Sequence, residues 1–193
     1  MIRRLYDWTI AQAQTPHALW TLAFISFIES SVFPIPPDVL LLPMVLAAPH
    51  RAWRIAAVCT VASVLGGLAG YGIGYLLYEE VGRPVLEFYG KADQIAAFRE
   101  MYGEWGAWIV FGAGLTPFPY KVITIMSGAM TLDLVVFMVA SVLSRGLRFF
   151  LVAALLWKFG RPIRTFIEAR LGLLTTIFFV LLLGGFVAIR YLF

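Results

Sequence analysis

The hydrophobic pattern divides the chain into long apolar stretches separated by short polar segments. The clearest stretch, Ile55–Tyr78, has 24 residues without a charge and predicts a transmembrane helix. Further spans are expected at residues 134–157 and 171–189. The polar segment 79–104 keeps one apolar edge, which predicts an interfacial helix, and residues 1–17 predict an amphipathic lead-in.

Two other apolar stretches, residues 18–48 and 105–132, are interrupted by prolines. In the first, Ala18–Ile28 and Val39–Ala48 are each too short to cross a bilayer alone. Proline cannot donate a backbone hydrogen bond and disfavours helix in the residue before it. We therefore expect each stretch to form a re-entrant hairpin, with one kinked span as the alternative for residues 18–48. The interrupting residues are Pro34, Pro36, Pro37, Pro117 and Pro119.

The two interrupted stretches resemble each other in sequence. Aligning Pro34 on Pro117 places the acid Asp38 opposite the base Lys121. Irregular backbone at membrane depth survives only where protein or a water-filled cavity surrounds it, and paired broken segments are typical of transport sites. We therefore expect Asp38 and Lys121 to lie near each other or near a central cavity.

Composition supports a membrane protein, because 61% of the 193 residues are hydrophobic and only 13% are charged. The expected fold is an all-α integral membrane protein with one domain, residues 1–193, several transmembrane helices and two facing re-entrant hairpins. The net charge of +4 comes from bases dispersed between spans, which excludes a nucleic-acid partner. Most of these bases fall on the side of the amino terminus, which places that terminus in the cytoplasm.

Five charged residues fall within or beside the apolar stretches. A charge near the bilayer centre costs about 2.5–3.5 kcal/mol, so five of them imply a polar cavity or close pairing. Arg145 and Arg148 share one helix face, where two guanidinium groups could bind a phosphate or carboxylate. The alternative is that they pair with acids and only hold the fold. The five residues are Glu29, Asp38, Lys121, Arg145 and Arg148.

Each remaining charge has two interpretations. A desolvated carboxyl could exchange a proton near neutral pH, whereas a carboxylate at a helix start could act as a cap. Glu29 follows an apolar run, which favours the proton role, and Asp38 follows two prolines and fits either. Lys121 could bind an anionic head group or extend to the interface.

Small residues recur every four positions along Ile55–Tyr78, a spacing that lets another helix approach closely. With a single cysteine and no His, Asp and Glu cluster, no metal or other cofactor is expected. No serine-nucleophile elbow or phosphate loop is present, so we do not expect an enzyme. The small residues are Ala62, Gly66, Gly70 and Gly74.

Together these motifs resemble the DedA family, also called the SNARE-associated Golgi or VTT-domain superfamily, over residues 18–165. The resemblance rests on Glu29 with FPIPPD, GGLAGYGIGY, GLTPFPYKVITIMSG and SRGLRFF. The last motif and Lys121 are closest to the YqaA-like branch. The better-known branch has arginines around the second proline loop, where this chain has Gly114 and Tyr120-Lys121.

The resemblance implies two facing re-entrant hairpins and movement of polyprenyl-phosphate or other lipids between leaflets, often with proton dependence. It implies Glu29 and Asp38 as the acidic residues and Lys121, Arg145 and Arg148 as the basic ones. We therefore expect an inner-membrane translocase for an anionic lipid, either proton-coupled or passive. A small-ion or solute/proton antiporter and a non-transporting scaffold are the alternatives.

Overall fold

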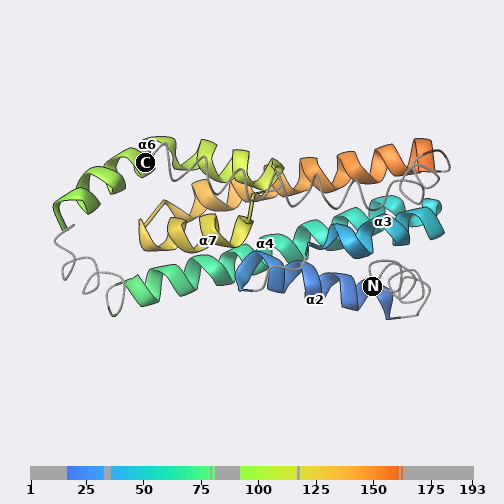
Figure 1. Cartoon of the computed structure of the whole chain (residues 1–193), viewed down its shortest axis with the longest axis horizontal. Coiled ribbons are helices and arrows are strands. Elements are labelled where there is room, and N and C mark those ends of the chain that lie inside the picture. The colour runs from blue at the N-terminus through green and yellow to red at the C-terminus, as the bar shows by residue number, and fades with distance from the viewer. Residues whose placement is uncertain are drawn as a thin grey trace.

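The computed structural model describes residues 17–32, 36–78, 80, 92–116, 118–160 and 162, and these residues are helical apart from short connections. The all-α prediction is therefore confirmed for them. The expected lead-in, the span at residues 171–189, most of the segment 79–91, and Pro34 and Pro117 lie outside the described residues. The elements are α2 (Ala18–Ser31), α3 (Asp38–Ala47), the 3-10 turn η1 (Pro49–Arg51), α4 (Ala52–Leu77), α6 (Ala92–Leu115), α7 (Tyr120–Ala129) and the helix Leu134–Gly160 (Figure 1).

The first interrupted stretch forms a helical hairpin. Ser26 of α2 contacts Cys59 of α4, and Ser30, one turn later, contacts Ser63, so α2 and α4 run in the same direction. Between them α3 carries the chain back to the end from which α2 started (Figure 1). Pro37 is the N-cap of α3, because its fixed φ suits a helix start and it needs no donor there.

The second interrupted stretch forms a similar hairpin. Arg99 of α6 donates to the carbonyl of Ala129, and Tyr102, one turn later, contacts Ser127, so α6 and α7 are antiparallel. Pro119 is the N-cap of α7. Helix α6 is continuous from Ala92 to Leu115, so the sequence boundary expected at residue 104 is not a helix end.

Each hairpin is followed by one long helix, and the two long helices run in opposite directions. Tyr71 of α4 donates to the carbonyl of Leu132, while Trp53, at the other end of α4, packs on Trp157. The chain therefore contains two units, α2–α3–α4 and α6–α7–Leu134–Gly160, of opposite orientation (Figure 1). Inverted repeats of this kind occur in many transporters.

Glycines on α4 allow both hairpins to approach closely. A Cβ on Gly66 would lie 2.8 Å from Phe27 Cα of α2, and one on Gly74 would lie 2.8 Å from the carbonyl carbon of Ile125 on α7. Between them, a Cβ on Gly70 would lie 3.1 Å from Thr124 Cβ. Because these contacts involve backbone or buried atoms, larger side chains here would separate the helices.

Two apolar clusters flank a polar layer. One joins α2, α3 and the start of α4 to the end of Leu134–Gly160, and the other joins α6 and α7 to the start of that helix. The helices Pro49–Leu77 and Leu134–Gly160 are long and apolar enough to cross a membrane. Large apolar side chains also cover the outer surface, as expected for contact with lipid. The buried layer between the clusters contains Ser26, Ser30, Ser63, Thr124, Ser141, Ser144 and Arg145.

Candidate functional site

The centre of the polar layer is an ion pair between the two inverted units. Arg145 of the second long helix donates through Nη2 to Glu29 Oε2 of α2 at 2.7 Å. The Arg145 side chain is 1% exposed and that of Glu29 is 14% exposed. Since unpaired charges at such burial are costly, this pair helps to hold the first hairpin against the second unit.

Two serine hydroxyls close a ring around this pair. Arg145 Nε donates to Ser63 Oγ at 2.6 Å, and Ser30 Oγ donates to Glu29 Oε2 at 3.1 Å. The hydroxyls of Ser30 and Ser63 are 2.7 Å apart. Because an arginine can only donate and a carboxylate can only accept, the Ser63 hydroxyl donates to Ser30. Glu29 Oε2 thus accepts two hydrogen bonds, from Arg145 Nη2 and from Ser30 Oγ.

Aromatic rings complete the surroundings of Arg145. Its guanidinium carbon lies 4.7 Å from the ring centre of Tyr120 and 4.8 Å from that of Phe149. Tyr120 is itself fixed by a hydrogen bond from its hydroxyl to Ser141. Cation–π contacts and the hydroxyl ring together leave Arg145 fully enclosed.

The second ion pair is more open. Arg148 Nη2 lies 2.5 Å from Asp38 Oδ2, and these side chains are 19% and 22% exposed. Arg148 Nη1 also donates to the carbonyl of Thr116, just after the end of α6. The N-cap of α3 is Pro37, and Asp38 follows it in the first turn of the helix. The Asp38 carboxylate is bound to Arg148 and does not cap the helix.

Lys121 lies where the tips of both hairpins meet. Its Nζ donates to the carbonyl of Val32, the C-cap of α2, at 3.2 Å. Thr124, one turn later, donates to the carbonyl of Ser30. Among the described residues no carboxylate pairs with Lys121, and Asp38 pairs with Arg148 rather than with its repeat equivalent.

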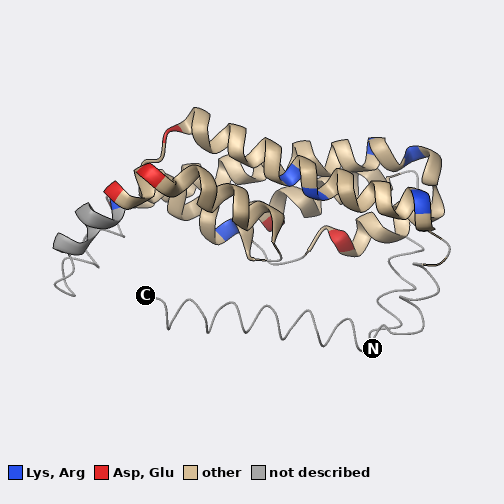
Figure 2. Cartoon of the chain, turned by 90° about the horizontal axis from the view of Figure 1, so that it is seen from above, with Lys and Arg blue, Asp and Glu red and all other residues tan. Residues whose placement is uncertain are grey.

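The site lies midway along the long helices. Arg145 is twelve positions after Asp133 and thirteen before Lys158, or roughly 18–20 Å from each at 1.5 Å per residue. In Figure 2 the ribbon positions of basic residues lie near one end of the molecule, mainly acidic positions lie near the other, and positions of both signs lie between them. Asp133 Oδ1 accepts a hydrogen bond from the backbone N–H of Val136 and so caps the start of the second long helix.

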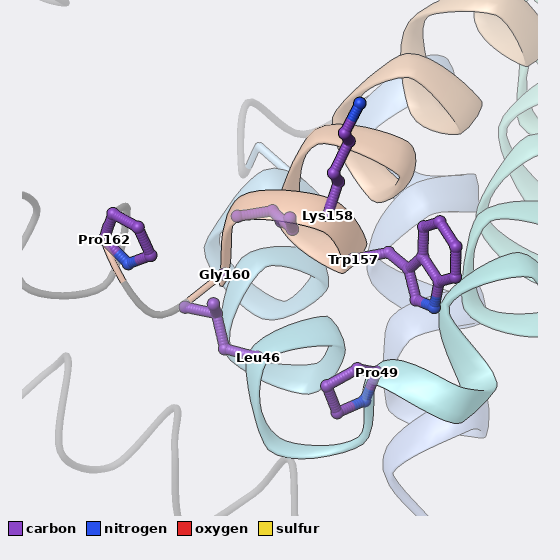
Figure 3. Close-up of a pocket in the computed structure, with 7 residues that line it drawn as sticks. Leu46, Pro49, Trp157, Lys158, Gly160 and Pro162 are labelled. Carbon is purple, nitrogen blue, oxygen red and sulfur yellow. The ribbon is translucent and has the colours of Figure 1, made fainter.

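A separate cavity lies at the end of the molecule where α3 gives way to η1 (Figure 3). Among the described residues Lys158 contributes the charge of its lining, and neither of the two ion pairs described above lines it. No group of three metal-ligating side chains is present among the described residues. The lining residues are Leu46, Pro49, Leu156, Trp157, Lys158, Gly160 and Pro162.

Sequence reasoning did not identify Ser30, Ser63 or the carbonyls of Val32 and Thr116 as parts of the site. The only available signal was that Ser26 and Ser30 on α2 have the same spacing as Cys59 and Ser63 on α4. That register becomes meaningful only once the two helices are known to be parallel.

The fold and the charges midway along its long helices are those of an α-helical membrane protein built from two inverted units. The chain belongs to the VTT-domain, or DedA, family, because the VTT domain model matches residues 35–158. A Haemophilus influenzae protein and a Histophilus somni protein, both described as uncharacterized, are each 39% identical over 168 residues. Each match covers 85% of this chain and 87% of the relative. No solved structure matches the chain.

Proposed function

We propose that this protein moves an anionic lipid, a polyprenyl phosphate or phospholipid, between the leaflets of the inner membrane. In this proposal both hairpins are re-entrant and their tips meet near the bilayer midplane. Lys121 and Arg148 bind the lipid phosphate, and Asp38 competes with the phosphate for Arg148 so that the lipid is released. The Arg145–Glu29 pair lies beside this site and orients it.

The observation that carries the proposal is the open position of the second ion pair. Arg148 and Asp38 are each about one fifth exposed. Apolar side chains at the hairpin tips are exposed too: Val39, which follows Asp38, by 41%, and Val32, whose carbonyl binds Lys121, by 61%. A polar group at mid-depth that adjoins an exposed apolar surface is reachable from the lipid side. A lipid needs this arrangement, because its head group must enter the site while its chains stay in hydrocarbon.

The excess of cations supports binding rather than a purely structural role. Both carboxylates already pair with arginines, which is what a non-transporting scaffold would need. Lys121, however, adds a third cation at the same depth, with a backbone carbonyl as its partner. Within the described part of the chain no carboxylate pairs with Lys121, and an intramembrane charge of this kind favours a functional site.

The test is a leaflet-translocation assay with the purified full-length protein in liposomes. The liposomes carry head-group-labelled phosphatidylglycerol or phosphatidic acid, and quenching of outer-leaflet label reports movement. We expect protein-dependent movement of both lipids, and loss of phosphatidic acid movement in Arg148→Ala. Protein-dependent proton flux with a soluble anion but no lipid movement would favour the antiporter instead. Absence of both activities in a monodisperse, correctly inserted protein would favour the scaffold.

A further inference from the structure

The mid-depth charges of this protein do not cancel. Two carboxylates, Glu29 and Asp38, face three cations, Lys121, Arg145 and Arg148. The sequence places no other charge in the apolar segments 55–78, 105–115 and 171–189. Because net charge is costly at membrane depth, the site is complementary to a single negative charge.

The contacts show which cation is available for that charge. Arg145 is bound to Glu29 and Arg148 to Asp38, whereas Lys121 donates to a backbone carbonyl. Since a carbonyl carries only a partial charge, a phosphate oxygen competes well with it for the ammonium group. A monoanion can therefore bind Lys121 while both arginine–carboxylate pairs stay intact.

A second negative charge needs a second cation, and the two arginines differ in availability. Arg145 is 1% exposed and is held by Ser63 and two aromatic rings, so its release would break the buried ring. Arg148 is 19% exposed and its other hydrogen-bond partner is the carbonyl of Thr116. Arg148 is thus the arginine that can turn to a ligand.

Release of Arg148 leaves Asp38 without its counter-ion. An unpaired carboxylate at this depth becomes neutral by taking a proton. Asp38 pairs with Arg148 on the second long helix, and Cys59 on α4 interacts electrostatically with Asp38, Arg145 and Glu29. Glu29 stays paired in its hydroxyl ring, which leaves Asp38 as the acceptor.

We infer that the site binds a phosphodiester monoanion on Lys121 without a proton, and binds a phosphate monoester dianion on Lys121 and Arg148 together with one proton on Asp38. This inference rests on the proposed function, because it concerns the same site. The proton comes from the aqueous phase with the lipid and leaves with it. Proton coupling is then a property of the lipid class, since monoesters carry nearly two charges near neutral pH and diesters carry one.

The test measures proton uptake when lipid binds the purified full-length protein in detergent micelles. Calorimetric titration at pH 8, in two buffers of different ionisation enthalpy, gives the number of protons taken up per lipid. At that pH the monoester phosphatidic acid is mostly dianionic, while the diester phosphatidylglycerol is monoanionic. We expect about one proton per phosphatidic acid and about zero per phosphatidylglycerol. Equal uptake for the two lipids would overturn the inference.

Matched variants assign the proton to one carboxyl. Asp38→Asn should bind phosphatidic acid without proton uptake, and its affinity should no longer fall about tenfold per pH unit above pH 8. Glu29→Gln, if monodisperse, should keep the uptake. Uptake that persists in Asp38→Asn, or that disappears only in Glu29→Gln, contradicts the assignment to Asp38.

Micelle binding and liposome translocation separate this inference from the proposed function. A protein that binds both lipids with the expected proton numbers but moves neither would overturn the transport function and leave the inference standing. A protein that moves both lipids with the same proton uptake for each would support transport and overturn the inference.

Discussion

Ser63 of α4 accepts a 2.6 Å hydrogen bond from Arg145 Nε and contacts Ser30 of α2, so one hydroxyl connects both inverted units. Ser63→Ala should leave Arg145 Nε unsatisfied and lower stability by about 1–3 kcal/mol. Thr60→Ala is the matched control, because the Thr60 hydroxyl bonds only to Ala56 of its own helix. Thermal unfolding in detergent measures the stability of both variants. Equal losses of stability in Ser63→Ala and Thr60→Ala would show that the contact between Ser63 and Arg145 contributes nothing extra.

Arg145→Ala should destabilise the protein more than Arg148→Ala does. Removing Arg145 leaves Glu29 without its buried partner, a change that costs about 3–5 kcal/mol in such pairs, whereas Asp38 is 22% exposed against 14% for Glu29. The double variant Glu29→Gln/Arg145→Met should recover much of the loss. Detergent melting curves of the four proteins are the measurement. Equal destabilisation by the two alanine variants would contradict the distinction between the pairs.

Alanine at Gly66 or Gly74 should impair folding, whereas alanine at Gly72 should be tolerated. A Cβ at the first two positions would overlap backbone of α2 or α7, but a Cβ at Gly72 meets nothing within 4 Å. All three glycines lie on α4, so alanine changes the helix propensity equally at each position. The variants differ only in what the added Cβ contacts. Size-exclusion chromatography compares the monodispersity of the three variants, and thermal unfolding compares their melting temperatures. Similar behaviour of all three would show that the close approach is unimportant.

Lys121→Gln should reduce translocation of phosphatidylglycerol at least about tenfold, equivalent to roughly 1.4 kcal/mol of lost interaction. Lys121→Arg should keep most of the rate, since a cation at that position is the requirement. Lys158→Gln, at the far end of the second long helix, controls for a general loss of surface charge. A wild-type translocation rate in Lys121→Gln would show that Lys121 does not bind the lipid phosphate.

Re-entrant hairpins place His17 and His50 on the same side of the membrane. Single cysteines at these exposed positions, in a Cys59→Ala background, should both react with an impermeant maleimide from the cytoplasmic side. Glu104→Cys, on the opposite side of the expected topology, should react only from outside. Labelling of His17→Cys and His50→Cys from opposite sides would make residues 18–48 a crossing segment and refute the paired-hairpin topology.

The positions of the helices follow largely from the sequence. The uncharged run Ile55–Tyr78 corresponds to α4, and the stretch 134–157 corresponds to the helix Leu134–Gly160. Proline acts locally, so Pro37 and Pro119 already indicate where α3 and α7 begin. The boundary expected at residue 104 differs because a change from polar to apolar composition does not end a helix.

The pairing of the charges could not be predicted in the same way. Glu29 and Arg145 are 116 positions apart, and Asp38 and Arg148 are 110 apart. Which acid meets which arginine depends on how the hairpins pack on the long helices, a tertiary property with no local signal. The same holds for the carbonyls of Val32 and Thr116, since every residue has a carbonyl and only the fold selects two of them.

The division of charge between the two units has a consequence for biogenesis. Both mid-depth acids belong to the first unit and all three mid-depth bases belong to the second. At 5–20 residues per second, a ribosome needs on the order of ten seconds to reach Arg145 after it has made Glu29. During that interval neither carboxylate of the first unit has its arginine partner. Each of these carboxylates therefore gains its ion-pair partner only after the second unit has been synthesised.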